Sequence, residues 1–221
     1  MNEQIFINNS LFDGVNEFME NGYLEHKDLF VSLSSMQTPH TLFIGCSDSR
    51  VVPSLITSSK PGELFVVRNI ANIVPPYRLS DEFLATTSAI EYAINVFDLK
   101  NIVICGHSNC GGCEALYYDK SKFENIPNVR KWLEILSPIK HAVSEVYGDN
   151  VSKRSWVTER LNIINSIDNI LTFPTIKEKF ESGKINIHGW HYIIETGEIF
   201  EYDFNSKQFK FIGENDKSND K

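Results

Sequence analysis

The 221-residue sequence is short of cysteine, of basic residues and of long apolar runs, and each shortage excludes something. It has only four cysteines, and a chain of this length buries enough apolar surface to fold without disulfide or metal staples. Its 29 acidic residues outnumber 21 basic ones, which argues against a general nucleic-acid binder. No apolar stretch approaches the roughly 20 residues that span a bilayer, so no membrane segment is predicted.

Internal repeats, low-complexity blocks and a linker are also missing from the sequence. We therefore expect a single domain over residues 1–221, with a helical arm at 1–36 and a disordered tail at 213–221. The first ten residues, MNEQIFINNS, have neither the basic region nor the apolar core of a signal peptide, so we expect a cytoplasmic protein. Cysteines stay reduced in that compartment, where they serve as buried apolar residues, reactive thiols or metal ligands.

Apolar runs alternate with helical patterns along the chain, which predicts an α/β fold with a mainly parallel sheet flanked by helices. The expected strands cover residues 41–46, 64–68, 101–106, 184–192 and 198–204. The expected helices after the arm cover residues 80–97, 114–118 and 152–171, the last with an apolar stripe of Val157, Leu161, Ile164 and Ile167. Residues 119–150 are interpreted as two helices interrupted at Pro127 and Pro138.

Three side chains that can bind a metal follow two of the predicted strands. Cys46 closes the first strand, while His107 and Cys110 come directly after the third. The loops after parallel strands meet at one edge of a sheet, so neighbouring strands would bring these residues together. Two thiolates and an imidazole suit zinc in tetrahedral geometry, and a set of three ligands leaves the fourth position to water, as in catalytic sites.

Cys113 leaves two other interpretations open. It could join the three residues above in a closed Cys3His site, which would be structural. Cys110 and Cys113 also have the Cys-x-x-Cys spacing of a redox motif, so a zinc-stabilised binding or redox module is the alternative to an enzyme. Cys105 lies inside the third predicted strand and is interpreted as a core residue.

Asp48 and Arg50 place opposite charges two and four residues after Cys46. Arg50 can keep Asp48 ionised through a two-point contact, because guanidinium and carboxylate groups match in geometry. Asp48 could then accept a hydrogen bond from a hydroxide on the metal and fix its orientation. The alternative is an ordinary surface ion pair, which would contribute little.

At this point the sequence resembles a known family. Residues 46–51 (CSDSRV) together with residues 106–112 (GHSNCGG) resemble the signature pair of the β-class carbonic anhydrases. Residues 61–72, 88–93 and 188–190 are similar to further blocks of that family, and the likeness covers roughly residues 1–212. Residues 75–77 (PPY) resemble the plant-like subtype, as a bacterial member would.

The resemblance implies a fold and a reaction. It implies a five-stranded, mainly parallel sheet, and a homodimer or dimer of dimers in which the N-terminal helices lie on the partner. It also implies zinc-dependent, reversible hydration of carbon dioxide to bicarbonate and a proton, with one zinc ion per chain. A few members of the family act on carbon disulfide or carbonyl sulfide instead, and the residues do not decide between these substrates.

The resemblance also assigns roles to single residues. By that likeness the zinc ligands are Cys46, His107 and Cys110, and the catalytic dyad is Asp48–Arg50. The implied substrate contacts begin with Gln37, which hydrogen-bonds the substrate. The implied apolar pocket for carbon dioxide, supplied in part by the neighbouring subunit, is formed by Phe65, Ile70 and Tyr92. The backbone N–H of Gly111 is a further implied substrate contact. Phe43 stands where a regulated subtype has tryptophan, so we expect a site open to water and not closed by Asp48.

Overall fold

The computed structural model describes residues 11–80, 84–148 and 150–213. They fall into two compact units, within residues 1–38 and 39–221, and each is described by itself. Two expectations extend past these limits. The first ten residues of the helical arm and residues 214–221 of the predicted disordered tail lie outside the described residues, so the tail stays a prediction.

The N-terminal unit is helical over its described part, as expected for the arm. Helix α1 spans Leu11–Glu17, a π-helical turn spans Phe18–Gly22, α2 spans Tyr23–Glu25 and α3 spans Lys27–Leu33. The ring of Phe18 lies 6.3 Å from that of Tyr23 and 6.1 Å from that of Phe30. None of the helical residues is buried, and apolar side chains such as Leu11, Phe12 and Phe18 are exposed.

The second unit is built on one six-stranded sheet, which confirms the predicted α/β class with a mainly parallel sheet. Its strands are β1 (Thr41–Cys46), β2 (Leu64–Asn69), β3 (Asn101–His107), β4 (Asn186–Tyr192), β5 (Ile199–Asp203) and β6 (Gln208–Phe211), in the order β2-β1-β3-β4-β5-β6. The first four in that order are parallel, and β5 and β6 are antiparallel. The expected count of five strands was wrong, because the four-residue edge strand β6 is too short and too polar to stand out in the sequence.

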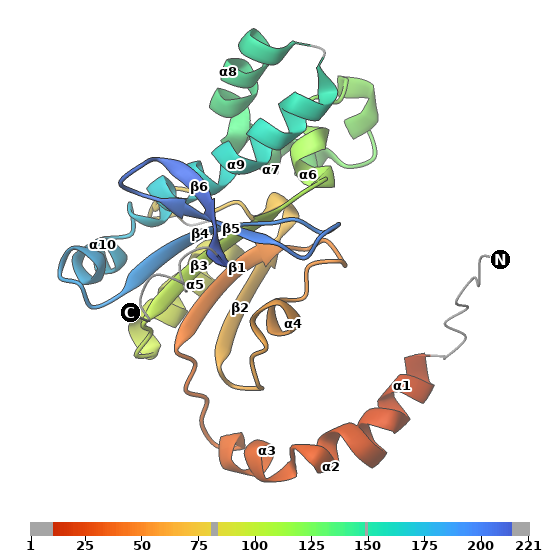
Figure 1. Ribbon diagram of the computed structural model, residues 1–221, viewed down its shortest axis with the longest axis vertical. Helices are drawn as coiled ribbons and strands as arrows, with labels where there is room; N and C mark the ends of the chain where they lie inside the picture. The colour runs from red at the N-terminus through yellow and green to blue at the C-terminus, as the bar shows by residue number, and fades with distance from the viewer. Residues whose placement is uncertain (1–10, 81–83, 149, 214–221) are drawn as a thin grey trace. The chain divides into compact units, whose positions relative to one another are not determined.

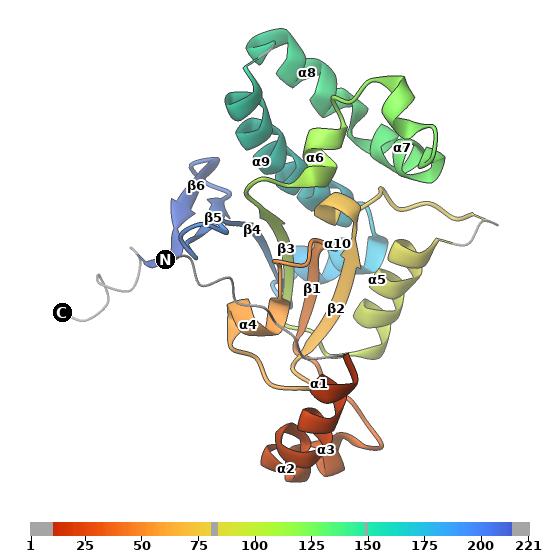
Figure 2. The same ribbon diagram turned by 90° about the vertical axis from the view of Figure 1, so that its right-hand side faces the viewer.

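Three helices cover one face of the sheet, which is where the larger part of the core lies (Figure 2). They are α5 (Ala85–Val96), α9 (Val151–Ile170) and α10 (Pro174–Glu181). Helix α9 packs so closely that a Cβ atom at Gly106 would stand 2.8 Å from Ile163, and one at Gly189 would stand 2.6 Å from Ile167. Glycine at these two positions is what lets the helix lie on β3 and β4.

The opposite face carries a smaller cluster made of Phe43, Val103 and Cys105, with Trp190 packed against it. Helix α4 (Pro53–Thr57), which the sequence did not suggest, lies on that side of the sheet in Figure 2. Cys105 is fully buried here, in agreement with its interpretation as a core residue.

Short helices beyond β3 form a second apolar cluster with the first half of α9 (Figure 1). They are α6 (Gly111–Ala115), α7 (Pro127–Leu133) and α8 (Ser137–Tyr147), joined by 3-10 turns at Lys120–Phe123 and Glu134–Leu136. Pro127 and Pro138 stand in the first turns of α7 and α8, so they start helices and do not interrupt them.

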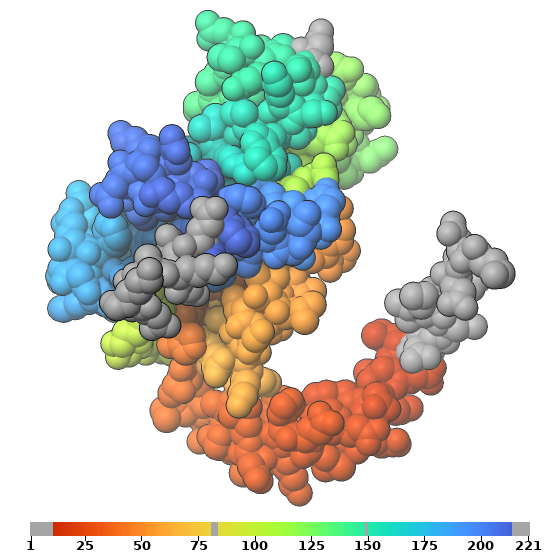
Figure 3. Space-filling view, viewed as in Figure 1, coloured from red at the N-terminus to blue at the C-terminus, as the bar shows by residue number. Residues whose placement is uncertain are grey.

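Several predicted boundaries move by a few residues. Helix α5 starts at Ala85 and not at Ser80, and α6 starts at Gly111 and not at Glu114. Helix α10 was not expected; Figure 3 shows it beside the β5–β6 hairpin, with the rings of Phe180 and Phe204 6.2 Å apart. None of the described helices combines the length and the apolar content that crossing a bilayer requires.

Candidate metal centre

The carboxyl edge of the sheet brings the predicted metal ligands together. Strands β1 and β3 are parallel neighbours that end in Cys46 and His107, and Cys110 directly precedes α6. The ligand atoms of these three buried residues all lie within 4.8 Å of one another. The two sulfur atoms are 4.0 Å apart, close to the separation of about 3.8 Å expected for two thiolates on one tetrahedral zinc ion.

His107 is oriented for ligation by its other ring nitrogen. Its Nδ1 donates to the backbone carbonyl of Ser108 at 2.9 Å, which leaves Nε2 as the nitrogen with a lone pair. That Nε2 atom is buried and has no hydrogen-bond partner among the described residues. An orphaned, buried imidazole nitrogen facing two cysteines is what a metal site requires.

The protein alone does not favour two thiolates at this place. The close approach of Cys110 and burial together raise the pKa of Cys46 to about 12. A cation beside the two sulfur atoms would reverse this preference, because it stabilises the deprotonated form. The donor set of two soft sulfurs and one nitrogen therefore fits zinc.

Cys113 is close to Cys110 but is not one of the three converging donors. It is buried in the cluster beneath α6, its sulfur is 3.9 Å from the side-chain nitrogen of Asn162, and it does not belong to the ligand atoms that converge. All four cysteines of the chain are free thiols. The converging set therefore has three donors and not the four of a closed Cys3His site, while the redox interpretation of Cys110 and Cys113 stays a prediction.

Asp48 and Arg50 form a two-point pair beside the candidate ligands. The guanidinium donates from Nε to Oδ1 at 2.9 Å and from Nη2 to Oδ2 at 2.8 Å. These bonds hold the pKa of Asp48 well below its usual range, so the carboxylate is ionised at neutral pH. Its Oδ2 lies 3.9 Å from Nε2 of His107, which places a fixed negative charge next to the converging donors.

Sequence reasoning gave no role to Arg68, which also supports this loop. At the carboxyl end of β2 it donates to the carbonyl of Cys46 at 2.9 Å and to the carbonyl of Asp48 at 2.6 Å. The sequence did offer one indication of this role, because Arg68 stands near the end of a predicted strand, and that strand pairs with the one that ends in Cys46.

A row of polar residues on α9 was also missed. Glu159 accepts from the backbone N–H of Cys110 at 3.1 Å, Asn162 donates to the carbonyl of Ala71 at 2.6 Å, and Ser166 accepts from the N–H of Val74 at 3.1 Å. All three side chains are buried. Of the predicted apolar stripe, Ile167 is buried in the main core and Val157 and Leu161 pack against the second cluster.

Two predicted substrate residues lie next to the candidate ligands. Ile70 begins a strained turn, in which Ala71 and Asn72 both have positive φ, of 63° and 46°. The turn packs against the first turn of α6, where a Cβ on Gly112 would meet Ala71 at 2.8 Å and Ile70 at 3.0 Å. Gly111, whose N–H was the predicted contact, is exposed at the start of α6.

The other predicted pocket residues, Phe65 and Tyr92, lie away from this site within the second unit. Phe65 pairs in register with Leu42, four positions before the pair of Asn69 with Cys46, or about 13 Å along the strand. Its ring lies 6.0 Å from that of Tyr92, which is half exposed on α5. Gln37 is exposed and belongs to the N-terminal unit.

Comparison with known proteins places the chain among enzymes of one kind. The family model described as "Carbonic anhydrase" matches residues 41–199. A carbonic anhydrase of Helicobacter pylori strain J99 is 44% identical over 207 residues, covering 92% of this chain and 94% of that protein. A carbonic anhydrase of Synechocystis is 39% identical over 197 residues, covering 87% of this chain and 70% of the relative.

Solved structures agree with these relatives. The β-carbonic anhydrase CcaA has a TM-score of 0.83 at 38% identity, with 91% of this chain and 90% of that chain covered. A tetrameric β-carbonic anhydrase of Sordaria macrospora has a TM-score of 0.74 at 31% identity, with 86% and 93% covered. The Coccomyxa β-carbonic anhydrase in complex with acetazolamide has a TM-score of 0.74 at 26% identity, with 86% and 84% covered.

Proposed function

The chain belongs to the carbonic anhydrase family, within its β class, and on that premise we propose that it hydrates carbon dioxide reversibly with one zinc ion per chain. The observation that carries the proposal is the convergence of three buried donors beside an ionised carboxylate. Cys46, His107 and Cys110 would hold the ion. When bound, zinc supplies a Lewis acid that brings the pKa of its water from 15.7 toward about 7.

Asp48 and Arg50 are the residues that we assign to orientation of the attacking water. The carboxylate would accept a hydrogen bond from that water, so that a lone pair faces the carbon atom of carbon dioxide. Arg50 engages both oxygens of Asp48 and also donates its own N–H to Oδ1 at 3.0 Å. Because these contacts tie Asp48 to the arginine, we propose that the carboxylate serves the water and is not itself a metal ligand.

The substrate side of the site follows from the neighbouring main chain. We assign Ile70 to the apolar wall beside carbon dioxide and the N–H of Gly111 to an oxygen of the substrate. The carbonyl of Ile70 accepts from the indole of Trp132 at 2.9 Å, which fixes the turn that carries this wall. Carbon dioxide is small and neutral, so an acidic protein needs no charged surface to attract it.

Stopped-flow hydration assays and zinc analysis test this function. We expect Asp48→Ala to keep its zinc and to lose activity about 100-fold, because the ligands stay and the orienting group goes. Asp203→Ala is the matched control: that carboxylate is also held by a cation, Lys210 at 2.7 Å, but lies on the β5–β6 hairpin. Equal activity of the Asp48→Ala variant and wild type would contradict the proposal, as would loss of zinc from Cys113→Ser.

We also propose that the protein acts as a homodimer or a dimer of dimers. The exposed apolar side chains of the N-terminal unit support this, among them Leu11 at 82% and Phe12 at 76% exposure. So does the distance along β2 between Phe65 and Asn69, the partner of Cys46 in the register, since a residue too far from its own chain's site can serve a neighbour's. Phe65 and Tyr92 are assigned to the neighbouring site on this basis, and Gln37 is assigned to a hydrogen bond with the substrate.

Hybrid dimers test the shared site. Asp48→Ala and Tyr92→Ala proteins are mixed, unfolded, refolded together and assayed. If the two residues act across subunits, each hybrid has one site with both changes and one intact site. Random pairing would then restore about a quarter of wild-type activity. If the activity of the mixture does not rise above that of the two parent variants, the assignment of Tyr92 is contradicted.

The cytoplasmic location stays a prediction.

A further inference from the structure

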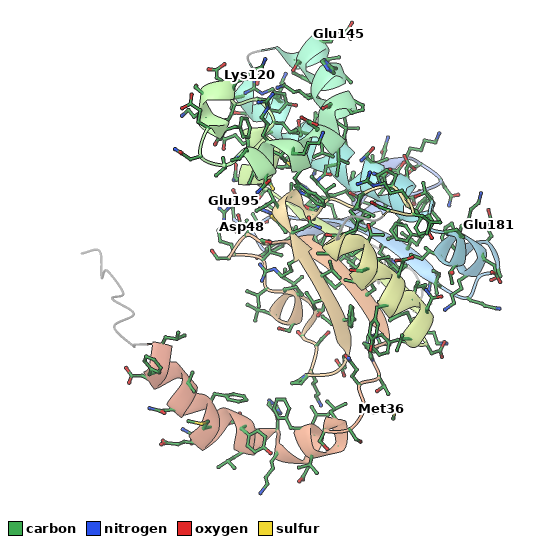
Figure 4. All side chains as sticks on the ribbon, turned by 180° about the vertical axis from the view of Figure 1, so that it is seen from behind. Met36, Asp48, Lys120, Glu145, Glu181 and Glu195 are labelled. Atoms are coloured by element: carbon green, nitrogen blue, oxygen red, sulfur yellow. The ribbon has the colours of Figure 1, made fainter. Side chains whose placement is uncertain are left out.

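Glu195 lies at the carboxyl edge of the sheet but belongs to none of the groups assigned so far. It follows β4 in the turn that leads to β5, and the register of β3 with β4 ends with His107 opposite Tyr192. The chain therefore leaves β4 beside the loop that leaves β3. Figure 4 shows the labelled Asp48 and Glu195 close together at this edge.

Both oxygens of Glu195 bond the two residues between the proposed ligands His107 and Cys110. Oε2 accepts from the hydroxyl of Ser108 at 2.7 Å, and Oε1 accepts from the side-chain amide of Asn109. Ser108 is held further by its own N–H, which donates to the carbonyl of Tyr192 at 2.9 Å. One carboxylate thus ties residues 107–110, the ligand loop, to the end of β4.

The backbone of the ligand loop needs this support at one position. Asn109 has a φ of 54°, in the left-handed region that residues other than glycine adopt at a cost. Asparagine tolerates this conformation better than most residues, and its amide is used here on Glu195. A carboxylate that engages this side chain favours the loop conformation that places the next residue, Cys110.

Asn109 also connects Glu195 to the proposed dyad. Its carbonyl accepts from Nη2 of Arg50 at 3.1 Å, and the same nitrogen donates to Oδ2 of Asp48 at 2.8 Å. A line of contacts therefore runs from Glu195 through Asn109 and Arg50 to Asp48. A shift of the ligand loop would move both a metal ligand and the guanidinium that aims the carboxylate.

We propose that Glu195 is a positioning residue, which holds the ligand loop through Ser108 and Asn109 so that Cys110 stays in ligating position and Arg50 stays aimed at Asp48. The inference rests on the proposed function, since it takes the loop to carry zinc ligands. The hydrogen bonds of the Glu195 carboxylate go to Ser108 and Asn109 and not to the proposed ligands, so its effect passes through the loop.

The test compares Glu195→Ala with Glu198→Ala, another exposed carboxylate in the same turn whose side chain accepts from Thr196 at 2.8 Å. Zinc transfer from each loaded protein to an excess of a coloured chelator gives a rate that does not depend on turnover. We expect Glu195→Ala to release zinc about tenfold faster and to lose about tenfold in kcat/KM, as for other residues that orient metal ligands. Glu198→Ala should match wild type in both.

A second pair of variants tests the route through Asn109. Asn109→Gly keeps the left-handed backbone and the carbonyl that Arg50 uses, but removes the amide that Glu195 engages. We expect Glu195→Ala to change the rate of zinc release and kcat/KM by a smaller factor in the Asn109→Gly protein than in wild type. Effects that multiply fully would overturn this route.

The outcomes separate this inference from the proposed function. Unchanged zinc release and kcat/KM in Glu195→Ala would overturn the inference while wild-type hydration activity stands. If Glu195→Ala releases zinc faster than the wild-type protein, and the wild-type protein does not hydrate carbon dioxide, the inference is supported and the proposed function is overturned. Equal effects of Glu195→Ala and Glu198→Ala would also overturn it, since any charge in the turn would then do.

Discussion

The carboxyl edge of the sheet and the β5–β6 hairpin carry the same kind of ion pair with different surroundings. Asp48 lies 2.8 Å from Arg50, and Asp203 lies 2.7 Å from Lys210. In both pairs the cation holds the pKa of the carboxyl group well below its usual range. Of the two carboxylates, only Asp48 lies beside a buried metal-binding atom without a hydrogen-bond partner, Nε2 of His107 at 3.9 Å.

Two histidine–carboxylate pairs repeat this contrast. Glu159 lies 3.2 Å from His191 beneath the ligand loop, and both side chains are almost fully buried. Glu201 lies 2.5 Å from His188 on the hairpin side, and both are about one-third exposed. A short distance between two ionisable groups therefore does not mark a site; burial and the convergence of several metal-binding side chains do.

Cys46→Ser gives the largest expected effect, because it removes a ligand from the one group of metal-binding side chains that converges among the described residues. A serine hydroxyl binds zinc much more weakly than a thiolate does, so the zinc content should fall far below one ion per chain. Hydration of carbon dioxide should then drop to the uncatalysed rate. Incubation of wild type with a strong chelator should do the same, and added zinc should restore only wild type. Full zinc content in Cys46→Ser would exclude this residue from the ligand set.

Glu159→Ala sharpens the comparison of the two histidine pairs. The change removes the hydrogen-bond partner of the buried His191 imidazole and of the backbone N–H of Cys110. We therefore expect a loss of about 3 kcal/mol in the free energy of unfolding. Glu201→Ala, on the exposed pair, should cost less than about 1 kcal/mol. Urea unfolding of both variants measures the difference, and equal midpoints would show that burial does not separate them.

The sequence was sufficient where one kind of side chain follows one kind of element. Strands β1 and β3 are almost wholly apolar and buried, so their ends were located to within a residue. Cys46, His107 and Cys110 stand at those ends, and the resemblance to β-class carbonic anhydrases that these motifs suggested is confirmed by the family match. Parallel pairing then brings the ends together without further information.

Sequence reasoning failed where polar side chains are buried to bond main chain far away in the sequence. Glu159 and Asn162 lie on the buried side of α9 because Cys110 and Ala71 offer them an N–H and a carbonyl. A search for apolar periodicity cannot find such residues, since their partners are 49 and 91 positions away. Glu195 was missed for the same reason, because its partners belong to another loop.

The pH dependence of activity belongs to the carboxyl edge alone. Two thiolates neutralise the charge of zinc, whereas three imidazoles would leave it at +2, so the water should be less acidic here than in a three-histidine site. We expect kcat/KM for hydration to rise about tenfold between pH 7 and 9. A rate that is flat from about pH 6 to 9 would contradict two thiolate ligands; Asp203→Asn should leave the profile unchanged.

Asp203→Asn gives the smallest effect and tests the hairpin pair by itself. Lys210 and then the N–H and hydroxyl of Ser206 lower the pKa of Asp203 in the folded protein below its value of about 3.9 in the unfolded chain. The folded state therefore gains stability from the ionised carboxylate above that value, and loses it as the pH falls through the lowered folded pKa. Thermal unfolding should show a small deficit of the variant at pH 7 that shrinks in acid below about pH 4. A deficit that grows in acid would reverse the sign and exclude an ionised Asp203 as its cause.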